Sequence, residues 1–272
     1  MSAIALKNVT LDSGVQLPYA ESGRPDGIPV VFVHGPGETW RSFQPVLGML
    51  PPTLHGFAPT QRGHGDASKP ADGYRPADYA ADLVAFLDAL GIERAVLAGG
   101  GSGGVAARIV AGGHPHRVAG LVLLGTPASL DGKEWAAEAR RVTDRLGEPD
   151  GPDPAELLPE DAADGAGPEW FATAMAEDAR ATPPRVWRET MDGLLDSEVG
   201  TTLGGILVPT LALRGDQDER VTPDDQARIT DTVPAARLDV LEGVGHAVHW
   251  EQPASVVGRL AEFAEAVTRR AA

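Results

Sequence analysis

Val96-Leu97-Ala98-Gly99-Gly100-Gly101-Ser102-Gly103-Gly104 is the stretch that decides the fold of this 272-residue chain. It begins as an apolar run, passes through a glycine-rich turn and enters a segment with helical spacing. Glycine is the residue of choice where a backbone must take a strained conformation or approach another segment closely. The stretch therefore predicts a buried strand that is joined to a helix by a sharp turn.

Strand and helix patterns alternate on both sides of this turn. Residues 4–11 and 15–20 predict a hairpin around Asp12-Ser13-Gly14, and Pro29–His34 is an apolar run typical of a strand buried on both faces. Further short apolar runs occur at 54–58, 94–98, 120–124, 210–214 and 237–241, and helical spacing occurs at 41–50, 76–90, 103–111, 223–231 and 253–270. This alternation predicts an α/β fold with a mainly parallel sheet and helices on both faces.

Between Thr126 and about Gly205 the alternation stops. The stretch is acidic and rich in proline, and it carries three of the five tryptophans, Trp135, Trp170 and Trp187, on segments with helical character. We expect a helical cap at residues 127–205, inserted into a core formed by 1–126 and 206–272, with a mobile loop near 148–167. The alternative is a surface insertion that lies away from any site. The three tryptophans favour the first interpretation, a lid that covers a pocket.

Composition excludes several classes of function. The hydrophobic content of 42% and charged content of 23% are typical of a soluble globular protein. A net charge of -16 argues against nucleic acid and anionic membranes as partners. The absence of cysteine excludes disulfides, thiolate metal sites and a cysteine nucleophile. We find no signal peptide, metal-ligand spacing or nucleotide-binding loop, and we expect a cytoplasmic protein without metal or cofactor.

Five motifs lie around the glycine turn in a definite order. They are Val33-His34-Gly35-Pro36-Gly37, Gln61-Arg62-Gly63-His64-Gly65, His114-Pro115-His116-Arg117-Val118, Arg214-Gly215-Asp216-Gln217-Asp218 and Gly243-Val244-Gly245-His246. In this order and at this spacing the chain resembles the α/β-hydrolase superfamily over nearly its whole length. The resemblance implies an α/β-hydrolase fold, a helical cap over a mainly apolar pocket and a small, partly hydrophobic substrate.

The resemblance also assigns roles. His246 would be the general base, and Asp218 would orient it, because a buried carboxylate fixes the imidazole tautomer and stabilises the imidazolium. The family's Gly-His-Ser-x-Gly-Gly elbow, aligned without gaps, places its nucleophilic serine at Gly101, which has no side chain to attack with. In that register Ser102 donates its backbone N–H to an oxyanion. A second register makes Ser102 the nucleophile, because residues 100–104 satisfy G-x-S-x-G, but it needs one extra residue in the elbow.

The loop that would complete the oxyanion site departs from the family as well. It spans Gly35, Pro36 and Gly37, and the family's second donor is the N–H of the residue after His-Gly. That residue is Pro36, which has no N–H, and one such donor contributes about 3–4 kcal/mol. Gly37 would replace it if the loop is kinked. We expect Trp40 and His34 to brace this loop, His64 to support its turn, and His249 and Trp250 to pack beside His246. We expect Glu38 to be a solvated loop residue, and the alternative is that it approaches the mouth of the pocket.

Three functions fit these residues. The first is hydrolysis of an ester, lactone or activated carbonyl by a water that His246 activates, or by Ser102 as a displaced nucleophile. The second is a lyase, isomerase or cyclase in which the His246–Asp218 dyad moves protons without a covalent intermediate. The third is a catalytically silent binding protein that keeps the pocket. The sequence leaves the oligomeric state open.

Overall fold

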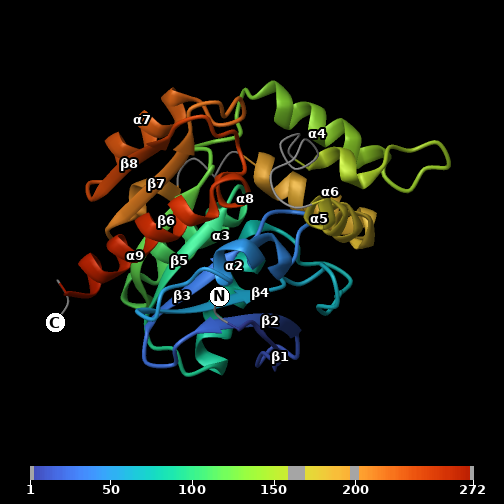
Figure 1. Cartoon of the computed structure of the whole chain (residues 1–272). Coiled ribbons are helices and arrows are strands. Elements are labelled where there is room, and N and C mark those ends of the chain that lie inside the picture. Colours follow the sequence, from blue (N-terminus) through green and yellow to red (C-terminus); the bar gives the residue numbers. More distant parts are fainter. Residues whose placement is uncertain (1–2, 159–168, 197–201, 270–272) are drawn as a thin grey trace.

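The structure, a computed structural model, describes residues 3–158, 169–196 and 202–269 (Figure 1). Within these ranges the chain forms one eight-stranded sheet. Its strands are β1 Ala5–Thr10, β2 Gln16–Gly23, β3 Ile28–Val33, β4 Leu54–Pro59, β5 Ala95–Gly100, β6 Val118–Leu124, β7 Thr210–Gly215 and β8 Ala236–Leu241.

The sheet has the order β1-β2-β4-β3-β5-β6-β7-β8. Strand β2 runs antiparallel to β1 and β4, and every other neighbouring pair is parallel. The predicted hairpin and the mainly parallel sheet are therefore confirmed. Because β3, β5 and β6 are parallel and adjacent, their carboxyl ends meet at one edge, where Val33 pairs with Gly99 and Gly100 pairs with Leu124.

Short and long helices connect the strands. They are α1 Gln44–Leu47, α2 Pro76–Ala89, α3 Gly103–Gly113, α4 Glu134–Arg145, α5 Glu169–Ala181, α6 Pro184–Leu195, α7 Pro223–Thr232, α8 Val248–Glu251 and α9 Pro253–Arg269, with 3-10 turns η1 Trp40–Phe43, η2 Pro115–Arg117 and η3 Pro154–Leu157. Among the described helices, none combines the length and the apolarity that a membrane span requires.

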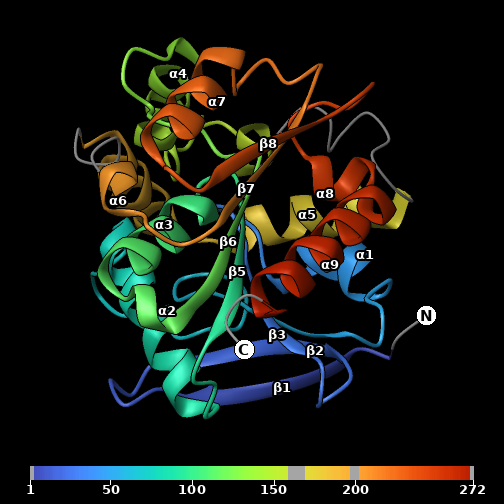
Figure 2. The same ribbon diagram turned by 90° about the vertical axis from the view of Figure 1, so that its left-hand side faces the viewer.

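The helices lie on both faces of the sheet. Figure 2 shows α2 and α3 on one side of the central strands and α1, α8 and α9 on the other. Alternate residues of β3 serve the two sides: Val31 and Val33 belong to one apolar cluster, while Val30 and Phe32 belong to the other. All four side chains are at most 1% exposed, which explains why this strand is a continuous apolar run in the sequence.

Helices α4, α5 and α6 and the turn η3 are inserted between β6 and β7. The insertion is held against the rest of the chain by polar and aromatic contacts: Thr39 Oγ1 donates to Asp178 of α5 over 2.7 Å, and the Phe171 and Trp250 rings lie 5.5 Å apart. Of the predicted mobile loop, residues 159–167 lie outside the described ranges. Its first part contains η3.

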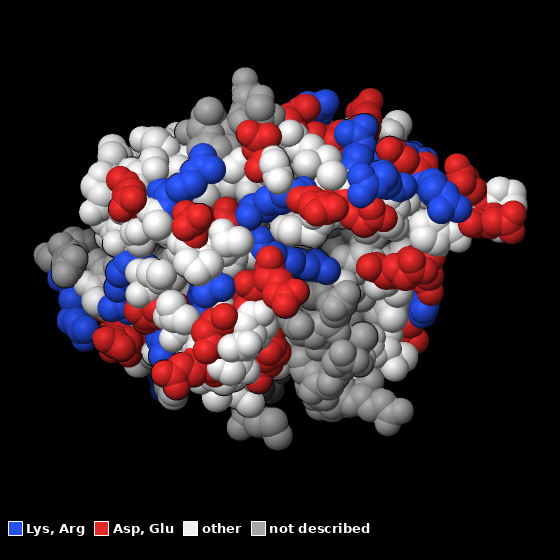
Figure 3. All heavy atoms as spheres, turned by 90° about the horizontal axis from the view of Figure 1, so that it is seen from above, with Lys and Arg blue, Asp and Glu red and all other residues white. Residues whose placement is uncertain are grey.

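Charges of both signs are mixed on the face of the molecule that carries the insertion. In Figure 3, which shows this face, Lys and Arg side chains are interspersed with Asp and Glu side chains.

Candidate active site

The turn between β5 and α3 is built from backbone atoms in close contact. A Cβ on Gly99 would lie 2.4 Å from the Gly104 backbone, and a Cβ on Gly103 would lie 2.2 Å from the carbonyl oxygen of Val33. The turn itself is made by Gly101, whose φ is +52°. The run of glycines in the sequence therefore reflects two different needs, close packing at Gly99 and Gly103 and a left-handed backbone at Gly101.

Gly101 differs from its neighbours because it faces open space. A Cβ at this position would lie 3.9 Å from His246 Nε2, and no other described atom outside its chain neighbours lies within 4 Å of it. Its own N–H is used within the sheet, where it donates to the carbonyl of Leu124 over 2.9 Å. The structure thus brings Gly101 and His246 together, with room between them for an atom that neither residue supplies.

His246 follows β8, and Asp218 follows β7. His246 Nδ1 lies 3.1 Å and 3.0 Å from the two carboxylate oxygens of Asp218. Asp218 Oδ1 also accepts the backbone N–H groups of Arg220 and Val221, each over 2.9 Å. Burial acts to raise the pKa of Asp218, but the hydrogen bonds from His246 and the backbone prevail and lower it.

The consequence is a defined imidazole tautomer. An ionised carboxylate only accepts hydrogen bonds, so the proton of neutral His246 resides on Nδ1 and its Nε2 is the basic nitrogen. Nε2 is also the atom that faces position 101. The arrangement can take a proton from a group bound above the elbow turn.

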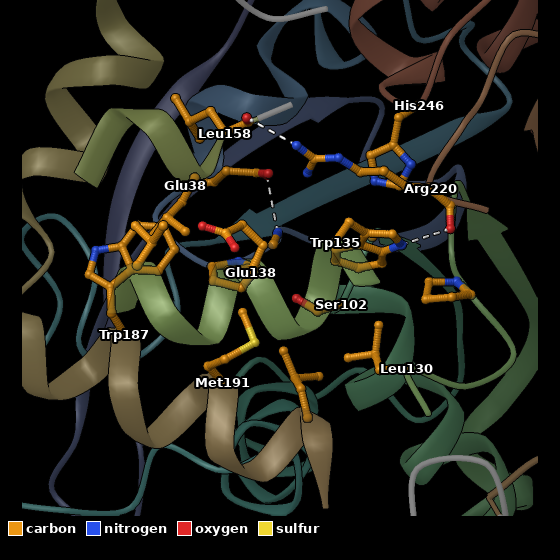
Figure 4. Close-up of a pocket in the computed structure, with 18 of the residues that line it drawn as sticks. Glu38, Ser102, Leu130, Trp135, Glu138, Leu158, Trp187, Met191, Arg220 and His246 are labelled. Atoms are coloured by element: carbon orange, nitrogen blue, oxygen red, sulfur yellow. Dashed lines mark hydrogen bonds between the residues drawn. The ribbon is translucent and has the colours of Figure 1, made fainter. Parts of the chain in front are cut away.

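A cavity of about 300 Å³ opens over this turn (Figure 4). Its core side includes Gly35, Pro36, Gly101, Ser102 and His246. Its other walls are mainly apolar and come largely from the insertion; they include Leu130, Trp135, Ala139, Val142, Leu157, Leu158, Trp187, Met191 and Leu194. A small organic molecule with a substantial apolar part fits such a lining.

The predicted lid tryptophans divide between two environments. Trp135 and Trp187 line the cavity, and Trp135 Nε1 donates to the carbonyl oxygen of Arg220 over 3.1 Å. Trp170 does not: its side chain is 49% exposed and stands edge-on to Phe171. Helix α5 instead turns Phe171 inward, where it is 1% exposed.

The loop after β3 makes a tight turn. Glu38 N–H donates to the Gly35 carbonyl over 3.4 Å, with Pro36 and Gly37 between them. Gly37 has a φ of +74°, which is the requirement at the third position of a type II turn, and proline suits the second. Ser102 also lines the cavity, and no described residue accepts a hydrogen bond from its N–H.

Two residues that the sequence grouped with this loop lie away from the cavity. Gly37 packs against the Trp187 ring, where a Cβ would come within 2.2 Å of the ring atoms. Trp40 begins η1, packs against the apolar cluster beside α9 and donates its N–H to Thr60 Oγ1. His34 is 1% exposed, and its Nε2 accepts the Gln61 N–H over 3.0 Å, as a bracing residue does.

Glu38 is where the sequence-based expectation is wrong. It is not solvated: the residue is 9% exposed, lines the cavity and accepts the Gly35 N–H on Oε2 over 3.1 Å. Burial raises the pKa of Glu38 to about 7, against the lowering effect of hydrogen bonds from Ser42 and Gly35. The signal for its burial was the Pro36-Gly37 turn, which folds residue 38 back over residue 35.

His249 lies behind the elbow. Its Nε2 is 3.1 Å from the hydroxyl of Ser42, and its ring stacks on Phe43 at 4.7 Å. Burial lowers the pKa of His249 to about 3, and the neighbouring charge of His246 acts in the same direction. His249 is therefore a neutral packing residue at physiological pH.

Known proteins share this fold and sequence pattern. A 2-hydroxy-6-oxo-2,4-heptadienoate hydrolase of Pseudomonas putida is 31% identical over 94% of this chain and 95% of its own length. A 3-oxoadipate enol-lactonase of Acinetobacter baylyi is 25% identical over 93% of this chain and 94% of its own. A hydrolase of Pseudomonas aeruginosa superposes with a TM-score of 0.81 at 24% identity, covering 95% of this chain and 97% of that one.

The family comparison extends over most of the chain. The model of the alpha/beta hydrolase family matches residues 30–259, which include the elbow turn, the loop after β3 and the turns that carry Asp218 and His246. The chain belongs to the alpha/beta hydrolase family and is an enzyme of the hydrolase type.

Proposed function

We propose that this enzyme hydrolyses an ester, a lactone or an activated carbonyl group of a small, partly apolar substrate, with water in place of a side-chain nucleophile. The observation that carries the proposal is the open space at Gly101, where a Cβ would lie 3.9 Å from His246 Nε2. A water oxygen in that space stands where the family's serine oxygen would stand. Hydrolysis by this water forms no covalent intermediate with the enzyme.

The chemistry follows from the dyad. His246 Nε2 takes a proton from the water while the water oxygen forms a bond to the substrate carbonyl carbon and the carbonyl electrons move onto oxygen. Asp218 stabilises the resulting imidazolium through Nδ1–H. The proton then passes from His246 to the leaving oxygen as the tetrahedral species collapses. The Ser102 N–H, at the elbow, is a donor for the transient oxyanion.

The relatives indicate where to look for substrates. Two of the proteins that match over nearly their whole length are named for a 3-oxoadipate enol-lactone and for 2-hydroxy-6-oxo-2,4-heptadienoate. An enol-lactone carries an activated carbonyl of the kind that a water nucleophile can attack. We therefore place aryl esters, enol-lactones and unsaturated oxo-acids first in a substrate panel.

The test combines turnover with covalent labelling. On a substrate found in the panel, His246→Ala should lose about 100-fold or more in kcat, since a positioned general base contributes that much. Ser102→Ala keeps its backbone N–H and should leave kcat nearly unchanged. A fluorophosphonate should form no adduct with the native chain. An adduct on Ser102, together with loss of turnover in Ser102→Ala, would show that Ser102 is the nucleophile and that the water mechanism is wrong.

A second candidate is favoured by Glu38. A buried carboxyl group that lines the same cavity as His246 offers an acid opposite a base, and such a pair moves protons between two positions of one substrate. That is the chemistry of an isomerase, a lyase or a base-catalysed cyclase. Turnover without incorporation of oxygen from ¹⁸O-labelled water would identify it.

A further inference from the structure

The site lacks one hydrogen-bond donor and holds one unexpected acid. Pro36 stands where the loop after β3 would offer an N–H, and Gly37 is turned against Trp187 and away from the cavity. At the elbow the Gly101 N–H is taken by the Leu124 carbonyl, whereas the N–H of Ser102, which lines the cavity, has no acceptor among the described residues. A tetrahedral intermediate bound at Gly101 therefore needs a second donor from a side chain.

The turn that removes the N–H also delivers Glu38. Pro36 and Gly37 reverse the chain, so that the Glu38 carboxyl returns to residue 35 and accepts its N–H over 3.1 Å. Gly35 permits this contact because it has no side chain: a Cβ there would lie 2.9 Å from Glu38 Oε1. Figure 4 shows Glu38, Ser102 and His246 around the same cavity.

We propose that Glu38, as a neutral carboxylic acid, donates the hydrogen bond that Pro36 cannot, and that Glu38 and the Ser102 N–H together hold the oxyanion. This role rests on the proposed hydrolysis. When water adds to the carbonyl, the new O–C bond forms, the carbonyl electrons move to oxygen and the water proton goes to His246. The Glu38 proton stays on its carboxyl and is shared with the oxyanion in a hydrogen bond.

The surroundings of Glu38 favour its protonated form. Its burial disfavours charge, and Asp178 of α5 adds a negative neighbour, so that the pKa of Glu38 rises to about 7. Arg41, three residues further along the chain, is paired with Asp178 and lies 3.8 Å from Glu177. The hydroxyl of Ser42 lies between Glu38 and the neutral His249.

The other charged groups around the cavity belong to different walls. They are His246, Arg220, Glu138 and Glu156. Arg220 donates to the Leu158 carbonyl over 3.2 Å, and its guanidinium carbon lies 5.7 Å from the Trp135 ring centroid, so the guanidinium is directed toward the insertion. Glu138 pairs with Arg141 on the surface of α4. The structure thus gives Glu38 no cation as a direct hydrogen-bond partner among the described residues.

The experiment compares three variants on a substrate from the panel. Glu38→Gln retains a donor and cannot ionise, so kcat should stay within about 10-fold of the native value. The native kcat should fall about 10-fold per pH unit above pH 7 as Glu38 loses its proton, and this decline should vanish in Glu38→Gln. Glu38→Leu has no donor and should lose about 100-fold or more at pH 6. Glu148→Gln, at an exposed carboxylate that pairs with Arg145 and does not line the cavity, is the matched control and should behave as the native chain.

A second measurement needs no substrate. The infrared difference spectrum between pH 6 and pH 8 should contain a carboxylic-acid C=O band that Glu38→Gln lacks. Equal kcat losses in Glu38→Gln and Glu38→Leu, a pH decline that survives in Glu38→Gln, or an unchanged infrared band would each overturn the role of Glu38 while leaving the hydrolysis intact. If no carbonyl substrate is hydrolysed at any pH, both proposals fail.

Discussion

At the scale of the residue, Gly101 combines the backbone of a sharp turn with the absence of a side chain. Gly101 retains the left-handed backbone that the turn requires, at a φ of +52°. A side chain at this position would point toward His246 Nε2, because that nitrogen is the described atom closest to the missing Cβ. His246 Nε2 therefore faces the space that a side chain at position 101 would occupy.

This geometry predicts that a serine placed at position 101 can act as a nucleophile. In Gly101→Ser the Cβ fits without a clash at 3.9 Å from His246 Nε2, and we expect a hydroxyl that points toward this nitrogen to come within hydrogen-bond distance of it. We expect the variant to gain a fluorophosphonate adduct at position 101 that the native chain lacks, located by peptide mapping. A non-glycine residue in a left-handed conformation costs about 1–2 kcal/mol, so the free energy of unfolding of Gly101→Ser should be lower than that of the native chain by about this amount.

Gly101→Ala is the control for that experiment. It carries the same backbone strain and no hydroxyl, so its stability should match that of Gly101→Ser while no adduct forms. Labelling of Gly101→Ala at Ser102, or of both variants alike, would show that the serine after the turn is the reactive group.

At the scale of the element, the strands and long helices could be predicted from the sequence, and the shape of the loops could not. Buried parallel strands are apolar runs and amphipathic helices repeat every 3.6 residues, so both leave a pattern. The four-residue helix α8 is too short to show a period. Whether Trp170 or Phe171 of α5 faces inward depends on packing against Trp250, which lies 80 residues away in the sequence. The burial of Glu38 likewise depends on the turn at Pro36-Gly37.

The contact between α3 and the strand ends gives a prediction about glycine within one helix. Gly103→Ala places a Cβ 2.2 Å from the Val33 carbonyl oxygen, a backbone atom that cannot move without disturbing β3. It should destabilise the chain by about 3 kcal/mol. Gly112→Ala, near the other end of α3, meets its nearest neighbour at 3.7 Å and should stabilise the chain by up to about 1 kcal/mol through helix propensity.

Urea unfolding followed by circular dichroism measures both changes. If the two alanine variants shift the midpoint equally and in the same direction, the close packing of α3 on β3 is not what requires glycine at position 103.

At the scale of the whole molecule, the cavity is assembled from segments that lie far apart in the chain. The loop after β3 and the elbow form its floor, and α4 and α6 form much of its walls. Hydrogen bonds from Thr39 to Asp178 and between Tyr79 and Thr190, both 2.7 Å, hold the insertion against the core. The sequence indicated that an insertion exists at 127–205. Its treatment as a separate cap domain stays a prediction.

Buried histidines set the response of the whole fold to acid. His34, His64 and His249 are at most 5% exposed, and burial lowers their pKa values to about 3, about 4 and about 3. Each is protonated in the unfolded chain below about pH 6.5 but stays neutral in the folded one, so stability falls as the pH falls below 6.5. Glu38 acts in the opposite sense. Its raised pKa, about 7, makes the fold more stable as the pH falls from 7 toward the ordinary value of 4.5.

The balance of these four groups can be measured. Between pH 7 and pH 5 each of the three histidines should lower the free energy of unfolding by about 2 kcal/mol, whereas Glu38 should raise it by about 2 kcal/mol. The expected net decrease in the free energy of unfolding is about 3–4 kcal/mol. His249→Gln should remove about 2 kcal/mol of that dependence, whereas the exposed His116→Gln should leave it unchanged. Urea unfolding at the two pH values decides the matter. If His249→Gln keeps the full native dependence, His249 is protonated inside the fold, and the packing of its ring on Phe43 then has to accommodate a charge.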